Sequence, residues 1–136
     1  MPRLRTEVER RFSDLDVMGH VNNVTYLVYL EEARVRLLTQ LGGAVDELPG
    51  LVVARQEIDY LRPLFLSAEP VVVECWVDRI GTTSFVLAYD VLDGDGGPVC
   101  ARALSVVVGF DQATQAKAPL APDIVALLGR YEDDQA

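Results

Sequence analysis

The spacing of apolar residues changes along the chain, from helical spacing before residue 42 to alternation after residue 51. Between residues 23 and 41, apolar side chains recur every three or four positions, as on one helix face: Tyr26, Leu30, Ala33, Leu37 and Leu41. Other apolar residues extend this surface around most of the first half: Val24, Leu27, Val28 and Leu38. The pattern predicts a long helix over residues 23–41, about 27 Å in length, that the rest of the protein encloses.

Four later segments have the pattern of β-strands. They are residues 51–61, 71–80, 84–91 and 99–110. Residues 5–12 form an earlier extended run, with Thr6, Val8 and Phe12 predicted on its inward face. Because the four later strands need no helical crossovers between them, we expect an antiparallel sheet.

Turn and cap residues mark the ends of these elements. Asn22 or Asn23 can cap the start of the long helix, and Gly42-Gly43 can close it. Residues 93–98 are typical of a hairpin, and residues 122–131 predict a short final helix that begins at Pro122. The expected fold class is therefore α+β, with a five-stranded antiparallel sheet wrapped around a long central helix.

Composition limits the architecture and the compartment. A chain of 136 residues with 50% hydrophobic content predicts one domain, residues 1–136, with a real core. Residues 1–11 are charged throughout, and no apolar run approaches the ~18 to 20 residues of a membrane span. Cys75 and Cys100 lie within apolar runs, which favours free buried thiols. We expect a soluble, cytoplasmic protein without a membrane partner.

The charge is strongly negative and the cations are almost all arginine. The net charge of −9, with no basic stripe, argues against nucleic acid as a partner. Only one lysine, Lys117, accompanies the arginines. An anionic ligand would therefore depend on a local arginine, whose planar guanidinium suits phosphate.

Residues 14–23 carry the candidate chemistry, because they bring two carboxylates and the only histidine to the start of the helix. A thioester carbonyl placed there would meet free N–H groups and the positive end of the helix dipole. A carboxylate on the preceding loop could attack that carbonyl or take a proton from attacking water. Asp16 lies three residues before Gly19, where the lack of a side chain lets substrate approach the backbone; Asp14 is expected to order the loop.

This region resembles a known family. The matching positions are Phe12-x-Asp14-x-Asp16-x-x-Gly19-His20-Val21-Asn22-Asn23-x-x-Tyr26-x-x-Tyr29-x-Glu31-x-Ala33-Arg34. They are similar to the hotdog-fold acyl-CoA thioesterases of the 4-hydroxybenzoyl-CoA thioesterase family, and to their long-chain acyl-CoA branch. The resemblance implies hydrolysis of acyl-CoA, Asp16 as nucleophile or general base, and Asn23 as the amide that polarises the carbonyl. It also implies a homodimer or homotetramer with sites at the subunit interface, and no cofactor.

Five further residues have two readings each. His20 either takes part in catalysis by positioning water or only hydrogen-bonds within the loop. Tyr26 and Tyr29 either line an acyl pocket or belong to the core. Arg62, just before Pro63, either meets a phosphate of coenzyme A or is a solvated surface charge. Glu57 either faces a partner subunit's site or is a solvent-facing acid.

Other classes of site fit the sequence less well. It has no Gly-x-Ser-x-Gly motif, and a single histidine without clustered cysteines argues against a metal site. A hotdog hydratase or dehydratase would pair Asp and His in an Asp-x-Asn-Pro-x-His motif, whereas His20 follows Asp16 by four residues. A non-catalytic acyl-CoA binding protein is the other alternative.

Overall fold

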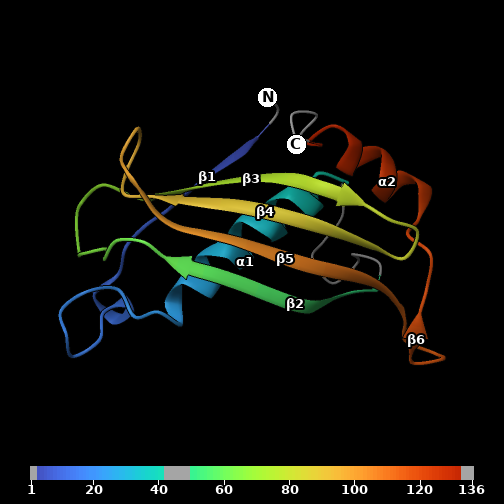
Figure 1. The fold of residues 1–136 in the computed structure, drawn as a ribbon, viewed down its shortest axis with the longest axis horizontal. Coiled ribbons are helices and arrows are strands. Elements are labelled where there is room, and N and C mark those ends of the chain that lie inside the picture. Colours follow the sequence, from blue (N-terminus) through green and yellow to red (C-terminus); the bar gives the residue numbers. More distant parts are fainter. Residues whose placement is uncertain (1–2, 42–49, 133–136) are drawn as a thin grey trace.

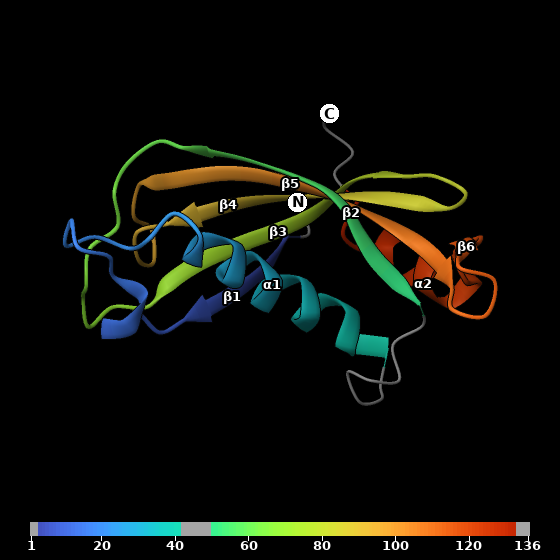
Figure 2. The same ribbon diagram turned by 90° about the horizontal axis from the view of Figure 1, so that it is seen from below.

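The structure is a computed structural model that describes residues 3–41 and 50–132. A curved sheet partly surrounds the helix α1 (Thr25–Leu38), and a second helix, α2 (Pro122–Gly129), lies toward the opposite end of the molecule from the start of α1 (Figures 1 and 2). Both helices contribute to the same cluster of buried apolar side chains. The α+β class predicted from the sequence is confirmed.

Among the described residues, the sheet is antiparallel, as predicted, but it has six strands instead of five. The strands are β1 (Leu4–Val8), β2 (Leu51–Tyr60), β3 (Val71–Ile80), β4 (Ser84–Leu92), β5 (Val99–Asp111) and β6 (Ala116–Lys117). Their order is β1-β3-β4-β5-β2, and β6 pairs with the end of β5. A two-residue strand is too short to give an alternating pattern, so the sequence did not indicate β6. β2 ends the order and is an edge strand.

The predicted helix of residues 23–41 is too long, because α1 has only 14 residues and a length of about 21 Å. At its start, the Asn22 side-chain oxygen accepts the Val24 N–H at 2.9 Å and closes a turn before the helix begins. Val24 is then the N-cap, without a side-chain bond, so the cap by Asn22 or Asn23 was wrong. At its end the chain tightens into a 3-10 turn, Thr39–Leu41. The Leu41 side chain and the predicted Gly42-Gly43 stop lie outside the described residues.

Two other predicted elements are also shorter. β1 ends at Val8, and Phe12–Asp14 forms a 3-10 turn in which Asp14 N–H donates to the Arg11 carbonyl. Phe12 is consequently 81% exposed and not inward-facing, whereas Thr6 is buried as predicted. α2 stops two residues early, since the next N–H groups bond three positions back and tighten the last turn.

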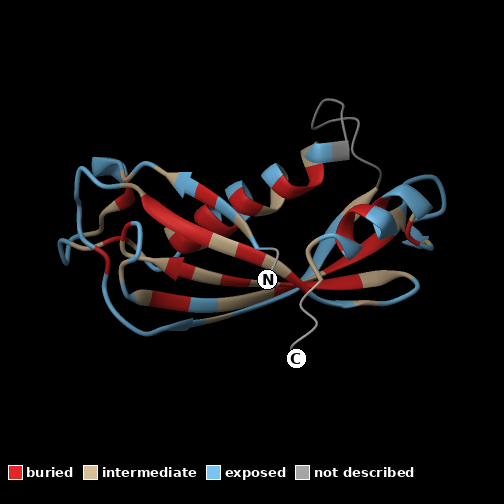
Figure 3. Cartoon of the chain, turned by 90° about the horizontal axis from the view of Figure 1, so that it is seen from above, coloured by how far each residue is buried: buried red, intermediate tan, exposed pale blue. Residues whose placement is uncertain are grey.

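The sheet covers one side of α1 and leaves the other open, as Figure 3 shows by the alternation of buried and exposed bands along the helix. Tyr29, Leu30 and Leu37 face the sheet and are buried, while Val24 is 61% and Val28 42% exposed. The prediction that the helix is enclosed was therefore wrong. Most side chains of the edge strand β2 are exposed as well.

The structure bears on the two cysteines and on the absence of a membrane-spanning helix among the described residues. Cys75 and Cys100 are both buried and free, as predicted. Within the described part of the chain, no helix has the length and apolar character needed to cross a membrane.

Candidate active site

Asp14 holds the motif loop together from its buried position. Its carboxylate accepts hydrogen bonds from the Arg11 N–H at 3.0 Å, the Arg11 guanidinium at 3.1 Å and the Tyr29 hydroxyl at 2.8 Å. Its carbonyl accepts the Asn22 N–H at 2.8 Å, which joins the two ends of the loop. Burial by itself raises the pKa of Asp14, but the donors from Arg11 and Tyr29 outweigh it and hold the pKa below the ordinary 3.8.

The tip of the loop is a tight turn around Asp16. Its carboxylate accepts the Met18 N–H at 2.9 Å, and its carbonyl accepts the Gly19 N–H at 3.0 Å. Gly19 has a φ of +86°, which favours glycine, and no atom lies within 4 Å of where a Cβ would sit. The positive φ therefore explains why glycine occupies this position, in addition to the close approach of substrate expected from the sequence.

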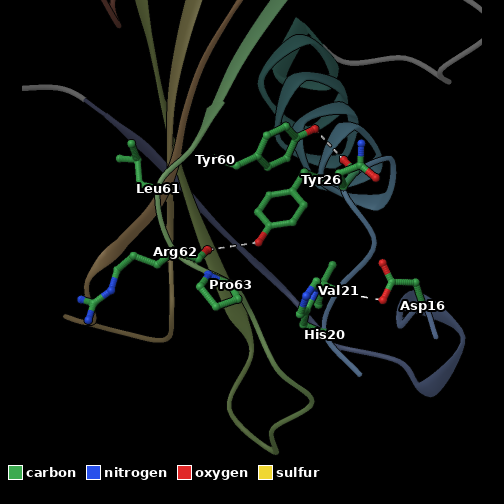
Figure 4. A pocket seen from close by; sticks show the side chains of 9 residues that line it. Asp16, His20, Val21, Tyr26, Tyr60, Leu61, Arg62 and Pro63 are labelled. Carbon is green, nitrogen blue, oxygen red and sulfur yellow. Dashed lines mark hydrogen bonds and ion pairs between the residues drawn. The ribbon is translucent and has the colours of Figure 1, made fainter. Parts of the chain in front are cut away.

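A cavity of about 260 Å³ opens between this loop and the end of β2. Its lining residues are Asp16, His20, Val21, Asn23, Tyr26, Tyr60, Leu61, Arg62 and Pro63 (Figure 4). Two segments about 40 residues apart in sequence thus form one pocket. A hydrogen bond from the Val21 N–H to the Leu64 carbonyl, at 2.8 Å, joins them directly.

Two polar groups in this cavity have unused hydrogen-bonding capacity. Asp16 Oδ1 accepts the Met18 N–H and lies 4.0 Å from His20 Nδ1, whereas its Oδ2 has no partner among the described residues. At the helix start, the Val24 N–H is bonded to the Asn22 side chain. The Asn23 N–H, by contrast, meets no acceptor within the described ranges. Two residues that line the cavity therefore carry unused groups, a carboxylate oxygen of Asp16 and the N–H of Asn23.

Two tyrosines stand between the helix and β2. Their rings are perpendicular, with centroids of Tyr26 and Tyr60 5.0 Å apart. The Tyr60 hydroxyl donates to the Asn23 carbonyl at 2.7 Å, and the Tyr26 hydroxyl to the Arg62 carbonyl at 3.5 Å. Burial raises the pKa of both, for Tyr26 to about 12, so both phenols keep their protons at neutral pH.

The structure brings five of the eight predicted site residues to the cavity: Asp16, His20, Asn23, Tyr26 and Arg62. The other three are elsewhere. Gly19 lies at the loop tip; Tyr29 is 1% exposed and bonded to Asp14 instead of lining the cavity. Glu57 forms an ion pair with Arg55 on β2 and lines no part of this cavity.

The sequence analysis did not predict four of the lining residues: Val21, Tyr60, Leu61 and Pro63. It also missed Phe65, whose ring stands edge-on to His20 at a centroid distance of 6.3 Å. One signal was present for residues 60–65: they lie at or just after the end of the strand predicted over residues 51–61, next to Arg62, which was a predicted site residue. In the described part of the chain, no three His, Cys, Asp or Glu side chains come together as a metal site.

The chain is similar in sequence to known proteins. The sequence matches the thioesterase-like superfamily over residues 10–128. The chain belongs to this superfamily. It is a thioester hydrolase with the hotdog fold, as the resemblance of the motif region predicted.

Individual relatives of this thioesterase span most of its length. The long-chain acyl-CoA thioesterase FadM of Escherichia coli (strain K12) is 31% identical over 115 residues, 82% of this chain and 86% of FadM. A thioesterase from Thermus thermophilus, crystallised with coenzyme A and Zn, is 35% identical, with a TM-score of 0.80 and coverage of 91% and 90%. A predicted thioesterase from Bacillus stearothermophilus is 28% identical, with a TM-score of 0.85 and coverage of 99% and 100%.

Proposed function

We propose that this thioesterase hydrolyses acyl-CoA to a free acid and coenzyme A, with Asp16 as the catalytic carboxylate. The observation that carries the proposal is that Asp16 Oδ2 and the Asn23 N–H, both without partners among the described residues, belong to residues of one cavity. The acyl-CoA substrate of FadM and the coenzyme A bound to the Thermus thioesterase support the choice of thioester.

The chemistry follows from these two groups. The thioester carbonyl oxygen accepts the Asn23 N–H, at the positive end of the α1 dipole, which stabilises the negative charge that develops on it. Asp16 either attacks the carbonyl carbon or takes a proton from a water that attacks it. The tetrahedral adduct then expels coenzyme A as the thiolate. If water attacked, the free acid is formed in this step; if Asp16 attacked, a mixed anhydride is left on Asp16, and water hydrolyses it to the free acid and the restored carboxylate. His20 orients that water; its Nδ1 lies 4.0 Å from Asp16 Oδ1, which supports this role.

The size and charge of the cavity fit one end of the substrate. About 260 Å³ holds the thioester and the first acyl carbons, so most of coenzyme A must lie outside it. Arg62 lines the cavity and is exposed, which suits a phosphate of coenzyme A in a chain that is otherwise acidic. Tyr26 supplies apolar surface for the acyl group.

We also propose a homodimer formed through the edge strand β2. Its ten residues present unpaired backbone groups at the end of the sheet order, and Val52 and Val53 are about 40% exposed. The open side of α1, with Val24 and Val28, would be covered by the same partner. Val53→Lys should convert a dimer into a monomer in sedimentation velocity. The homotetramer, the single domain and the cytoplasmic location stay predictions.

A free-thiol assay with short-chain, long-chain and aromatic acyl-CoAs tests the activity. The wild type should release thiol, and Asp16→Asn should lower kcat at least 100-fold with an unchanged far-UV CD spectrum and unfolding midpoint. Asp95→Asn, a change of the same kind at an exposed hairpin residue, is the matched control and should keep full activity.

Three other outcomes would redirect the proposal. Full activity of Asp16→Asn would remove Asp16 from the reaction. A change in enoyl absorbance without thiol release would point to hydration. Binding of acyl-CoA without either reaction would indicate a binding protein.

A further inference from the structure

Tyr60 connects the edge strand β2 to the start of α1. It is the last residue of β2, and its hydroxyl donates to the carbonyl oxygen of Asn23 at 2.7 Å. The perpendicular packing of its ring on Tyr26 holds the phenol in this direction. Among the described residues, this is the side-chain hydrogen bond that joins β2 to the turn before α1.

The hydrogen bond from Tyr60 holds Asn23, whose N–H has no acceptor among the residues that the structure describes. On its N-terminal side, the Asn22 carbonyl accepts the Thr25 N–H at 2.9 Å. That bond polarises the peptide unit that carries the Asn23 N–H and makes it a better donor. On its C-terminal side, Tyr60 holds the Asn23 carbonyl. Asn23 is thus held at both of its peptide units.

Direct contact of the Tyr60 hydroxyl with substrate is the competing role. A phenol has one proton to donate, and here it is directed to the Asn23 carbonyl at a short distance. Because the pKa of Tyr60 is raised by burial, the hydroxyl remains a donor at neutral pH. The proton is therefore committed to Asn23 and not available to an oxyanion.

We propose that Tyr60 is a positioning residue, which holds Asn23 so that its N–H meets the thioester carbonyl oxygen in the transition state. The inference rests on the proposed hydrolysis. Since a displacement of about 1 Å can cost on the order of 100-fold in rate, loss of this one hydroxyl should affect turnover more than binding. The edge strand thereby takes part in the alignment of the site.

Tyr60→Phe tests this, because it keeps the ring and removes only the hydroxyl. We expect kcat to fall about 10- to 100-fold with KM changed less than twofold. In ¹⁵N-labelled protein, the amide signals of Asn23 and Val24 should shift in the variant. Tyr131→Phe is the matched control, because it removes a hydroxyl that bonds to Gln40 at 2.7 Å in another part of the molecule. It should change neither kcat nor the amide signals of Asn23 and Val24.

The outcomes separate this inference from the proposed function. An equal kcat in Tyr60→Phe and the wild type would overturn the inference and leave hydrolysis intact. A lowered kcat with unmoved Asn23 and Val24 signals would also overturn it, and would make Tyr60 a direct substrate contact. If the wild type released no thiol, both would fall. If Tyr60→Phe proves unstable, the ¹³C chemical shift of the Asn23 carbonyl in the wild type can be measured instead. This shift reports the hydrogen bond from Tyr60 without any substitution.

Discussion

Replacing Tyr29 by phenylalanine tests how the buried Asp14 holds the motif loop. The change removes one hydroxyl, which lies 2.8 Å from the Asp14 carboxylate, and leaves the ring in place. Both residues are 1% exposed, so water cannot easily replace the lost donor. A hydrogen bond to a charged group contributes ~1.5–3 kcal/mol. We therefore expect the free energy of unfolding to fall by about 2 kcal/mol at pH 7.

The pH dependence follows from the lowered pKa of Asp14. A carboxylate whose pKa is lower in the folded state stabilises the fold above its unfolded-state pKa of about 4, and this contribution is lost as the pH falls through the folded-state pKa. The Tyr29 hydroxyl is one cause of the lowering. The stability difference between wild type and Tyr29→Phe should thus be full above about pH 5 and shrink as Asp14 is protonated.

Urea unfolding between pH 7 and pH 3, followed by the fluorescence of the single tryptophan, Trp76, measures this difference. Tyr131→Phe is the control, since its hydroxyl bonds to the neutral side chain of Gln40 near the surface. We expect it to cost about 0.5–1 kcal/mol at every pH. The reasoning is refuted if Tyr29→Phe costs no more than the control, or if its cost is the same at pH 7 and pH 3.

Three further predictions concern the loop and the core. Phe65→Leu should shift the imidazole proton NMR signals of His20, because the Phe65 ring centroid lies 6.3 Å from that of His20. These signals are easily identified in a chain with one histidine, and unchanged signals would contradict the contact. Leu30→Ala, at a fully buried site on α1, should lower the free energy of unfolding by about 2–5 kcal/mol in urea unfolding, and a loss below 1 kcal/mol would contradict its core position. Gly19→Ala should cost about 1–2 kcal/mol because of the positive φ, whereas Gly129→Ala, with equal open space and no such φ, should be neutral or slightly stabilising in thermal unfolding.

The expectations that the structure confirmed rest on local patterns. Alternation along residues 71–80 follows from the two-residue period of a strand, and β3 matches its predicted limits. The motif of Asp14, Asp16, His20 and Asn23 lies within ten consecutive residues, so the sequence alone placed these groups at the start of a helix. The resemblance to the thioesterase family rests on residues 12–34, which include this stretch. None of this depends on which distant segments come into contact.

Features that depend on contacts between distant segments were decided only by the tertiary structure. From their spacing, Tyr26 and Tyr29 both appear as apolar residues on the buried face of a helix. Only the fold shows that Tyr26 lines the cavity whereas Tyr29 donates a hydrogen bond to Asp14. Helical periodicity identifies an apolar face and not what covers it, so the exposure of Val28 could not be foreseen. Tyr60 bonds to Asn23 across 37 positions, because the fold brings the end of β2 beside the turn before α1. The sequence alone thus determined the chemistry that the loop carries, while the arrangement of strands decided which side chains complete the pocket around it.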